Sequence, residues 1–214
     1  MKKSHIILIT SITVLIGVGI YLYFRLTSFK TSLIRIAKGE AQKWNSITEL
    51  SEKASSFLLD YWKSVGINFT AKQMQSSSVQ STYPWSSAFI SYLFYKAGAK
   101  DKFPYSSSHS GYFQRAKANR DDKNAPLRGF RISEYSPKIG DLIIYSRESG
   151  KGYDSTGYFA SHGELVIEVG KGFVKAIGGN VSNKVKISTY STDEKGRLIQ
   201  KQVPFFMVIQ NNIR

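Results

Sequence analysis

The most apolar part of the chain is residues 6–24, a run of 19 residues without a charged side chain. At ~1.5 Å per residue, a helix of this length covers the ~30 Å hydrocarbon core of a bilayer. Tyr21, Tyr23 and Phe24 then fall where an interfacial aromatic belt forms. We therefore expect an uncleaved membrane anchor within residues 1–30. The alternatives are a buried core helix and a cleaved signal peptide, which favours a shorter run and a small-x-small cleavage site.

The next part of the chain has apolar residues at helical spacing, separated by polar stretches. Gly66 and Gly98 mark helix ends, Pro84 suits a first helical turn, and serines before His109 suit a cap. The predicted segments are a basic, partly helical connector (31–46), helices over 47–65, 84–97 and 106–119, and loops over 68–81 and 120–138.

The last third of the chain changes to the shorter apolar runs that are typical of strands. The predicted strands cover residues 141–146, 162–169, 173–178, 185–189 and 205–209. Gly170-Lys171-Gly172 predicts a hairpin with a three-residue turn, in which Val169 pairs with Phe173. Helices followed by a mostly antiparallel sheet predict an α+β domain over residues 47–214.

Composition limits the chemistry that this domain can perform. The chain has no cysteine, so disulfides, thiolate nucleophiles and Cys-containing zinc sites are excluded. Of its three histidines, His5 adjoins the apolar run, which leaves His109 and His162 for a soluble site. No cofactor or bound metal is expected.

The formal net charge is +15, of which four positive charges lie in residues 1–30, leaving 15 − 4 = +11 on residues 31–214. A basic surface suits nucleic acid, anionic lipid or an anionic wall polymer. The lysines are scattered and no nucleic-acid motif is present, so nucleic acid is not an expected partner.

The predicted hairpin suggests a candidate site. Its register places His162 opposite Asn180, and Glu164 points to the same face. An imidazole oriented by an amide or a carboxylate is part of a nucleophile–base arrangement, and Ser86, in a first helical turn, is a candidate nucleophile. On spacing alone, a surface histidine and a capping serine are the simpler interpretations.

Several ordered motifs carry a resemblance to known families. They are Pro84-Trp85-Ser86-Ser87-Ala88-Phe89-Ile90-Ser91, Ser106-Ser107-Ser108-His109, Pro137-x-x-Gly140-Asp141-Leu142-Ile143, the strand led by His162, and Gly178-Gly179-Asn180-Val181. The order resembles CHAP-type cell-wall amidases, which are papain-like and carry Cys where this chain has Ser86. The set is most similar to a bacterial family, domain of unknown function 2272, and covers about residues 47–210. That family has Asp where this chain has Glu164.

The resemblance implies a CHAP-like hydrolase of an amide or peptide bond in the cell envelope, with peptidoglycan or another anionic wall polymer as partner. In it, Ser86 attacks, His162 is the base, and Asn180 or Glu164 orients the imidazole. Trp85 and His109 are candidate substrate contacts, although aromatic residues at this spacing are also typical of a core.

Two alternatives stay open. One is a non-catalytic wall-binding module on the same fold. The other is a metal-dependent hydrolase that uses His109, His162 and Glu164 as ligands.

The anchor and the resemblance together predict a single-pass protein of the bacterial cell membrane whose domain lies outside the cytoplasm. The flanking charges point the other way. Lys2 and Lys3 precede the apolar run, whereas five basic residues follow it within 25–43, and the positive-inside rule would place that side in the cytoplasm.

Overall fold

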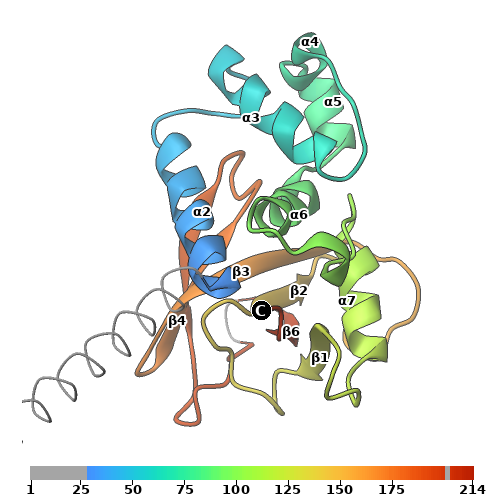
Figure 1. Ribbon diagram of the computed structural model, residues 1–214, viewed down its shortest axis with the longest axis vertical. Helices are drawn as coiled ribbons and strands as arrows, with labels where there is room; N and C mark the ends of the chain where they lie inside the picture. Colours follow the sequence, from blue (N-terminus) through green and yellow to red (C-terminus); the bar gives the residue numbers. More distant parts are fainter. Residues whose placement is uncertain (1–27, 201–202) are drawn as a thin grey trace, which may run out of the picture.

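A computed structural model describes residues 28–200 and 203–214. Helices occupy the first half of this region and strands the second (Figure 1). The helices are α2 (Phe29–Lys43), α3 (Glu52–Lys63), α4 (Ala71–Met74), α5 (Ser77–Thr82), α6 (Ser86–Lys96), the short 3-10 helix η1 (Lys100–Lys102) and α7 (His109–Ala118). The strands are β1 (Leu127–Arg131), β2 (Leu142–Ser146), β3 (Ser161–Gly170), β4 (Phe173–Gly178), β5 (Lys186–Ser191) and β6 (Phe205–Asn211). The predicted α+β class is confirmed.

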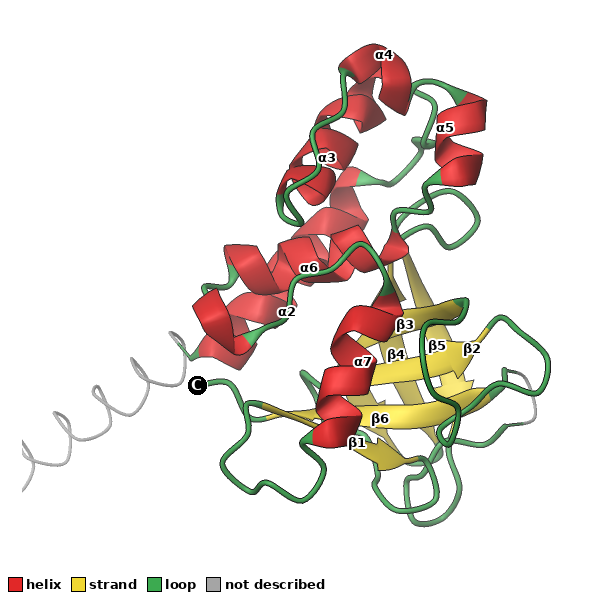
Figure 2. Cartoon of the chain, turned by 90° about the vertical axis from the view of Figure 1, so that its right-hand side faces the viewer, coloured by secondary structure: helices red, strands yellow, loops and turns green. Residues whose placement is uncertain are grey.

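The strands form one six-stranded sheet in the order β1-β6-β2-β3-β4-β5, and every neighbouring pair is antiparallel. Figure 2 shows α7 lying across the sheet, while α3, α4 and α5 extend away from it. The helix α6 lies between these two groups and contacts both α3 and β3. This central position brings the start of α6 next to the first residues of β3.

The larger hydrophobic core joins the helices to one face of the sheet. Phe89 and Leu93 of α6, Phe113 of α7 and Leu165 of β3 are buried members of it. A smaller cluster around Ile143, with Val166 and Phe205 among its members, covers the opposite face. Both faces of the central strands are therefore buried, which explains why β2 and β6 have nearly continuous apolar runs rather than alternating ones.

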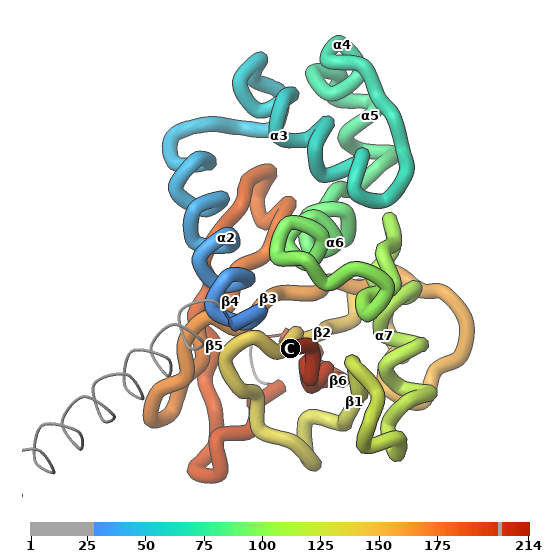
Figure 3. The backbone as a smooth tube through the Cα atoms, viewed as in Figure 1, coloured from blue at the N-terminus to red at the C-terminus, as the bar shows by residue number. Residues whose placement is uncertain are grey.

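The predicted connector over residues 31–46 is largely the helix α2, and it belongs to the core. Leu33 and Ala37 lie one turn apart and are buried in the cluster shared with α6. In the next turn Glu40 accepts hydrogen bonds from Tyr61 (2.6 Å) and from the Lys43 ammonium (2.7 Å). Basic residues occupy the outer face of α2, so the narrow apolar stripe is hard to recognise in the sequence. Figure 3 shows how α2, from the start of the described chain, lies beside β4, which comes about 130 residues later.

Three further predictions on secondary structure are corrected. The predicted loop over 68–81 contains α4 and most of α5, and the predicted loop over 120–138 contains β1. The helix expected from residue 47 begins at Glu52, because the Ser51 side chain caps it by accepting from the Ala54 amide at 3.2 Å. These short elements are held by tertiary packing, so their own sequences carry little periodic signal.

In the described part of the chain, no helix combines the length and the apolar character needed to cross a membrane. The predicted anchor, residues 6–24, lies outside the described residues.

Candidate active site

The candidate site begins at the first turn of α6. Trp85 is the N-cap residue, so Ser86 is the first helical residue. The Trp85 indole is fully buried, stacks on Trp44 with ring centroids 4.8 Å apart, and donates to Glu49 Oε2 at 2.9 Å. Trp85 therefore fixes the entry of the chain into α6 from within the core. This placement corrects its prediction as a substrate contact.

The side chain of Ser86 meets His109. Ser86 Oγ lies 2.7 Å from His109 Nε2, although the residues are 23 positions apart. His109 opens α7 directly after Ser108, whose side chain caps that helix by accepting from the Ser110 amide. The N-terminal turns of α6 and α7 thus converge, and they bring a hydroxyl and an imidazole into hydrogen-bond contact.

A second hydrogen bond orients the His109 ring. His109 Nδ1 is in contact with the Tyr112 hydroxyl, one turn further along α7. Burial, together with the nearby His162 and Arg147, holds the pKa of His109 well below its usual 6.5, so the imidazole is neutral at pH 7. When Nδ1 carries the proton and donates a hydrogen bond to the Tyr112 hydroxyl oxygen, Nε2 is free to accept a hydrogen bond from Ser86. Burial also raises the pKa of Tyr112 well above 10, which keeps its hydroxyl protonated.

Ser86 and His109 line a cavity of about 310 Å³. Each side is provided by a different element: the turn before α6, the cap of α7, the end of β2 and the segment that leads into β3. The lining residues are Pro84, Ser86, Ser107, Ser108, His109, Arg147, Phe159, Ala160 and Ser161. Ser86 is 6% exposed and His109 4% exposed, so the pair lies at the bottom of this cavity and is sheltered from bulk water.

The first turn of α6 also offers backbone donors beside Ser86. Trp85 makes no side-chain capping hydrogen bond to this helix. Amide N–H groups in a first helical turn have no partner within the helix and carry the positive end of its dipole. They suit an oxygen that develops negative charge next to Ser86 Oγ.

His162 lies behind His109 and does not contact Ser86. The two imidazole rings pack with centroids 5.3 Å apart. Among the described residues, the hydrogen-bond partner of His162 is Arg147, whose Nη2 donates to Nδ1 at 3.3 Å. The predicted contact between Ser86 and His162 is thus replaced by one between Ser86 and His109.

Glu164 adjoins His162 as predicted, but the two groups do not form a charged pair. Their Nε2 and Oε1 atoms are 3.6 Å apart, which is within ion-pair distance yet longer than a hydrogen bond. Burial lowers the pKa of His162 to about 3 and raises that of Glu164 to about 7, so both groups favour their neutral forms between these two pH values. Arg147 only donates, which places the His162 proton on Nε2, facing the carboxyl group. Tyr190 completes the cluster by donating to Glu164 Oε1 at 2.8 Å.

Asn180 is not the orienter of His162. The hairpin turn has two residues rather than the predicted three, because Gly170 pairs with Phe173 and Val169 with Val174. A bulge between Val166 and Glu168 then restores the predicted register at Leu165, which pairs with Ile177. β4 nevertheless ends at Gly178, and Asn180 turns into the left-handed region with φ 56°. No hydrogen bond joins Asn180 to His162 within the described residues.

Gly163 provides the space in which the His109–Tyr112 pair packs. A Cβ atom at this position would lie 2.5 Å from the Tyr112 hydroxyl oxygen and 2.8 Å from His109 Nδ1. Because both rings are buried, neither can move away without disturbing the core.

We expect Gly163→Ala to lower the free energy of unfolding by about 1–3 kcal/mol, the usual range for overpacking. Urea denaturation measures this change. The matched control is Gly152→Ala, where the new Cβ meets only an ordinary contact at 3.7 Å, and we expect a change within about 0.5 kcal/mol. Equal stability of the two variants would contradict the proposed packing.

A substitution at Glu164 tests its raised pKa. A carboxyl group whose pKa is higher in the folded state contributes stability below pH 4.5, and this contribution is lost as the pH rises through about 7. Glu164→Gln removes the ionisation and keeps an acceptor for Tyr190. We therefore expect the variant to match the wild type near pH 4.5 and to exceed its unfolding free energy by roughly 3 kcal/mol at pH 8. The control is Glu168→Gln on the surface. If the difference in unfolding free energy between Glu164→Gln and the wild type does not vary with pH, the raised pKa of Glu164 is contradicted.

The geometry gives no support to a metal site at these residues. Within residues 28–200 and 203–214, no group of three or more His, Asp or Glu side chains is arranged to hold a metal ion.

The comparisons with known proteins place the chain in a family. Residues 40–208 match the family described as uncharacterized proteins conserved in bacteria (DUF2272), and the chain belongs to this family. The match includes α3, α6, α7 and all of the residues discussed at the site. No curated protein matches the chain, and no solved structure matches it.

Proposed function

We propose that this protein is a membrane-anchored hydrolase of the bacterial cell envelope that cleaves an amide or peptide bond, with peptidoglycan as the substrate. The observation that carries the proposal is the 2.7 Å contact between Ser86 Oγ and His109 Nε2 at the bottom of a cavity. A serine hydroxyl needs a neutral base in contact to become a nucleophile, and His109 meets that need.

In the proposed reaction, Ser86 Oγ attacks the carbonyl carbon while its proton moves to His109 Nε2. The carbonyl oxygen becomes an oxyanion beside the first-turn amides of α6. The carbon–nitrogen bond then breaks, and His109 Nε2 returns the proton to the leaving amine. Water, deprotonated by His109, hydrolyses the acyl-enzyme in the second half of the reaction.

Tyr112 is a positioning residue in this scheme. Its hydroxyl accepts from His109 Nδ1 and thereby keeps the other ring nitrogen directed at Ser86. When His109 takes the proton from Ser86, the same hydroxyl faces the imidazolium. A neutral hydroxyl here takes the place that a carboxylate has in a Ser-His-Asp triad.

The substrate class and location rest on the resemblance to CHAP-type amidases, on the apolar run over residues 6–24 and on the basic domain. The +11 charge of residues 31–214 favours approach to an anionic wall. The proposal replaces His162 by His109 as the base and assigns the buried pair of His162 and Glu164 to the support of the His109 ring.

The proposal is tested by incubating the full chain, in detergent, with defined muropeptides and analysing the products by mass spectrometry, with and without a chelator. Cleavage that persists with chelator supports the serine mechanism. Cleavage that requires metal favours the metal-dependent alternative, and saturable binding without products favours a wall-binding module.

A further inference from the structure

A second feature of the molecule is a basic groove along α2, at the other end of β3 from the cavity. Two hollows of about 690 and about 710 Å³ follow this helix and share Lys38, Gln42 and Ile167, so they are continuous. We call this feature the α2 groove. Its lining residues are Lys30, Thr31, Ile34, Arg35, Lys38, Gly39, Ala41, Gln42, Trp44, Asn45, Ser46, Ile139, Ile167, Glu168, Lys175, Lys184, Val185, Lys186, Ile187 and Thr189.

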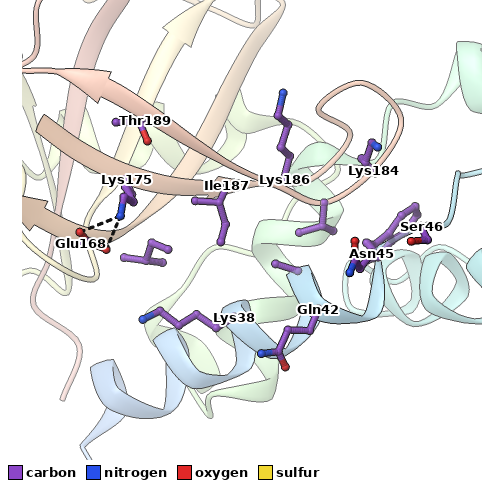
Figure 4. A pocket seen from close by; sticks show the side chains of 14 residues that line it. Lys38, Gln42, Asn45, Ser46, Glu168, Lys175, Lys184, Lys186, Ile187 and Thr189 are labelled. Carbon is purple, nitrogen blue, oxygen red and sulfur yellow. Dashed lines mark hydrogen bonds and ion pairs between the residues drawn. The ribbon is translucent and has the colours of Figure 1, made fainter.

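The charge of the α2 groove is strongly one-sided. It contains six basic side chains and one acid, Glu168, which is paired with Lys175 at 3.0 Å (Figure 4). Within the described residues, Arg35, Lys38 and Lys184 have no acidic side chain at ion-pair distance. The groove thus presents uncompensated positive charge to whatever occupies it.

The same groove exposes apolar side chains between these cations. Ile187 is 44% exposed, and Figure 4 shows it pointing from β5 toward α2. Ile139 is 47% exposed and lies in the other hollow. Basic side chains around exposed aliphatic ones are the composition by which proteins bind the interface of an anionic membrane.

The position of α2 in the chain places this helix close to any membrane that residues 6–24 would span. The apolar run ends at Phe24 and α2 begins at Phe29. Five residues of chain reach no more than about 18 Å, so the first turn of α2 must lie within that distance of the membrane face if residues 6–24 span the bilayer. The groove starts at Lys30, in that same turn.

We infer that the α2 groove docks on the anionic phospholipid headgroups of the membrane that holds the anchor, an inference that rests on the anchor in the proposed function. Docking fixes the orientation of the domain. Along β3, Ser161 lines the cavity and Ile167 lines the groove, and six residues of strand span about 20 Å. The docked domain therefore holds its cavity away from the lipid surface, toward the wall.

The experiment uses the full chain in nanodiscs, and the absence of native cysteine allows a single label. Ile187→Cys carries an environment-sensitive fluorophore, and doxyl lipids quench it when it reaches the interface. We expect quenching in discs that contain phosphatidylglycerol and little in discs of phosphatidylcholine alone. The matched control is Tyr158→Cys, a 76%-exposed position beside the cavity, which should stay unquenched in both.

A charge variant tests whether the basic side chains of the α2 groove cause the docking. Arg35→Gln, Lys38→Gln and Lys184→Gln together should weaken docking on the order of 100-fold, because each cation near an anionic surface contributes about fivefold. The control removes the same number of charges outside the α2 groove, at the exposed residues Lys72, Lys102 and Lys151. It should change docking little. Near-ultraviolet circular dichroism checks that both variants are folded.

Three results would overturn the inference. One is an unquenched label at position 187 in phosphatidylglycerol discs, and another is equal quenching at position 158. The third is a stronger response to soluble polyglycerol phosphate in phosphatidylcholine discs, which would make the ligand a wall polymer. If the protein does not remain with the discs, the proposed anchor has failed instead, and muropeptide cleavage, measured separately, reports on the active site.

Discussion

Ser86→Ala is expected to reduce muropeptide cleavage on the order of 10⁴-fold or more, because no other hydroxyl lies 2.7 Å from His109 Nε2 within the described residues. The fold should be unaffected, since alanine suits the first turn of a helix. Product formation is followed by mass spectrometry, and the free energy of unfolding is measured in parallel. The control is Ser56→Ala on the exposed face of α3, whose hydroxyl only bonds to the Lys53 carbonyl of its own helix.

A chemical variant at the same position strengthens this test. Ser86→Cys would introduce the chain's only thiol, next to a neutral imidazole. It should restore part of the cleavage and become sensitive to iodoacetamide, because a thiol is more readily ionised than a hydroxyl. Undiminished cleavage by Ser86→Ala would dismiss Ser86 as the nucleophile.

The second large effect is expected at His109. Replacing it by Gln removes the base and should abolish cleavage to a similar extent as Ser86→Ala. His162→Gln should retain measurable cleavage, because His162 touches the reacting pair only through the His109 ring. The residual cleavage rates of His109→Gln and His162→Gln decide which histidine is the base. A lower rate for His162→Gln would favour His162, as predicted from the sequence.

The pH profile provides an independent readout of the same assignment. The active form has neutral His109, whose pKa lies well below 6.5, so kcat/KM should stay high down to below pH 6.5 and fall only in more acidic solution. Tyr112→Phe removes the acceptor at Nδ1. We expect it to lower kcat about 10- to 100-fold with little change in KM, as for groups that orient a catalytic residue. A change in KM alone would indicate a substrate contact instead.

The sequence already predicted much of the local structure near the site. Pro84 and the apolar run after it placed a helix whose first turn holds Ser86, and the Ser-rich stretch before His109 placed the cap of α7. These are short-range signals, set by capping and backbone geometry, and they need no knowledge of distant contacts. A histidine in the first turn of a second helix was a usable signal for the base, but both the predicted hairpin register and the resemblance favoured the strand histidine, His162.

What the sequence by itself determined was the order of helices before an antiparallel sheet, the membership of the DUF2272 family and the candidate groups Ser86, His109, His162 and Glu164. Only the tertiary structure decided which imidazole meets the hydroxyl, because side-chain partners are chosen by packing between distant segments. Gly163 leaves the space that the His109–Tyr112 pair occupies, and the end of β4 at Gly178 separates Asn180 from His162. Periodicity reports which face of an element is buried, but not what lies against it.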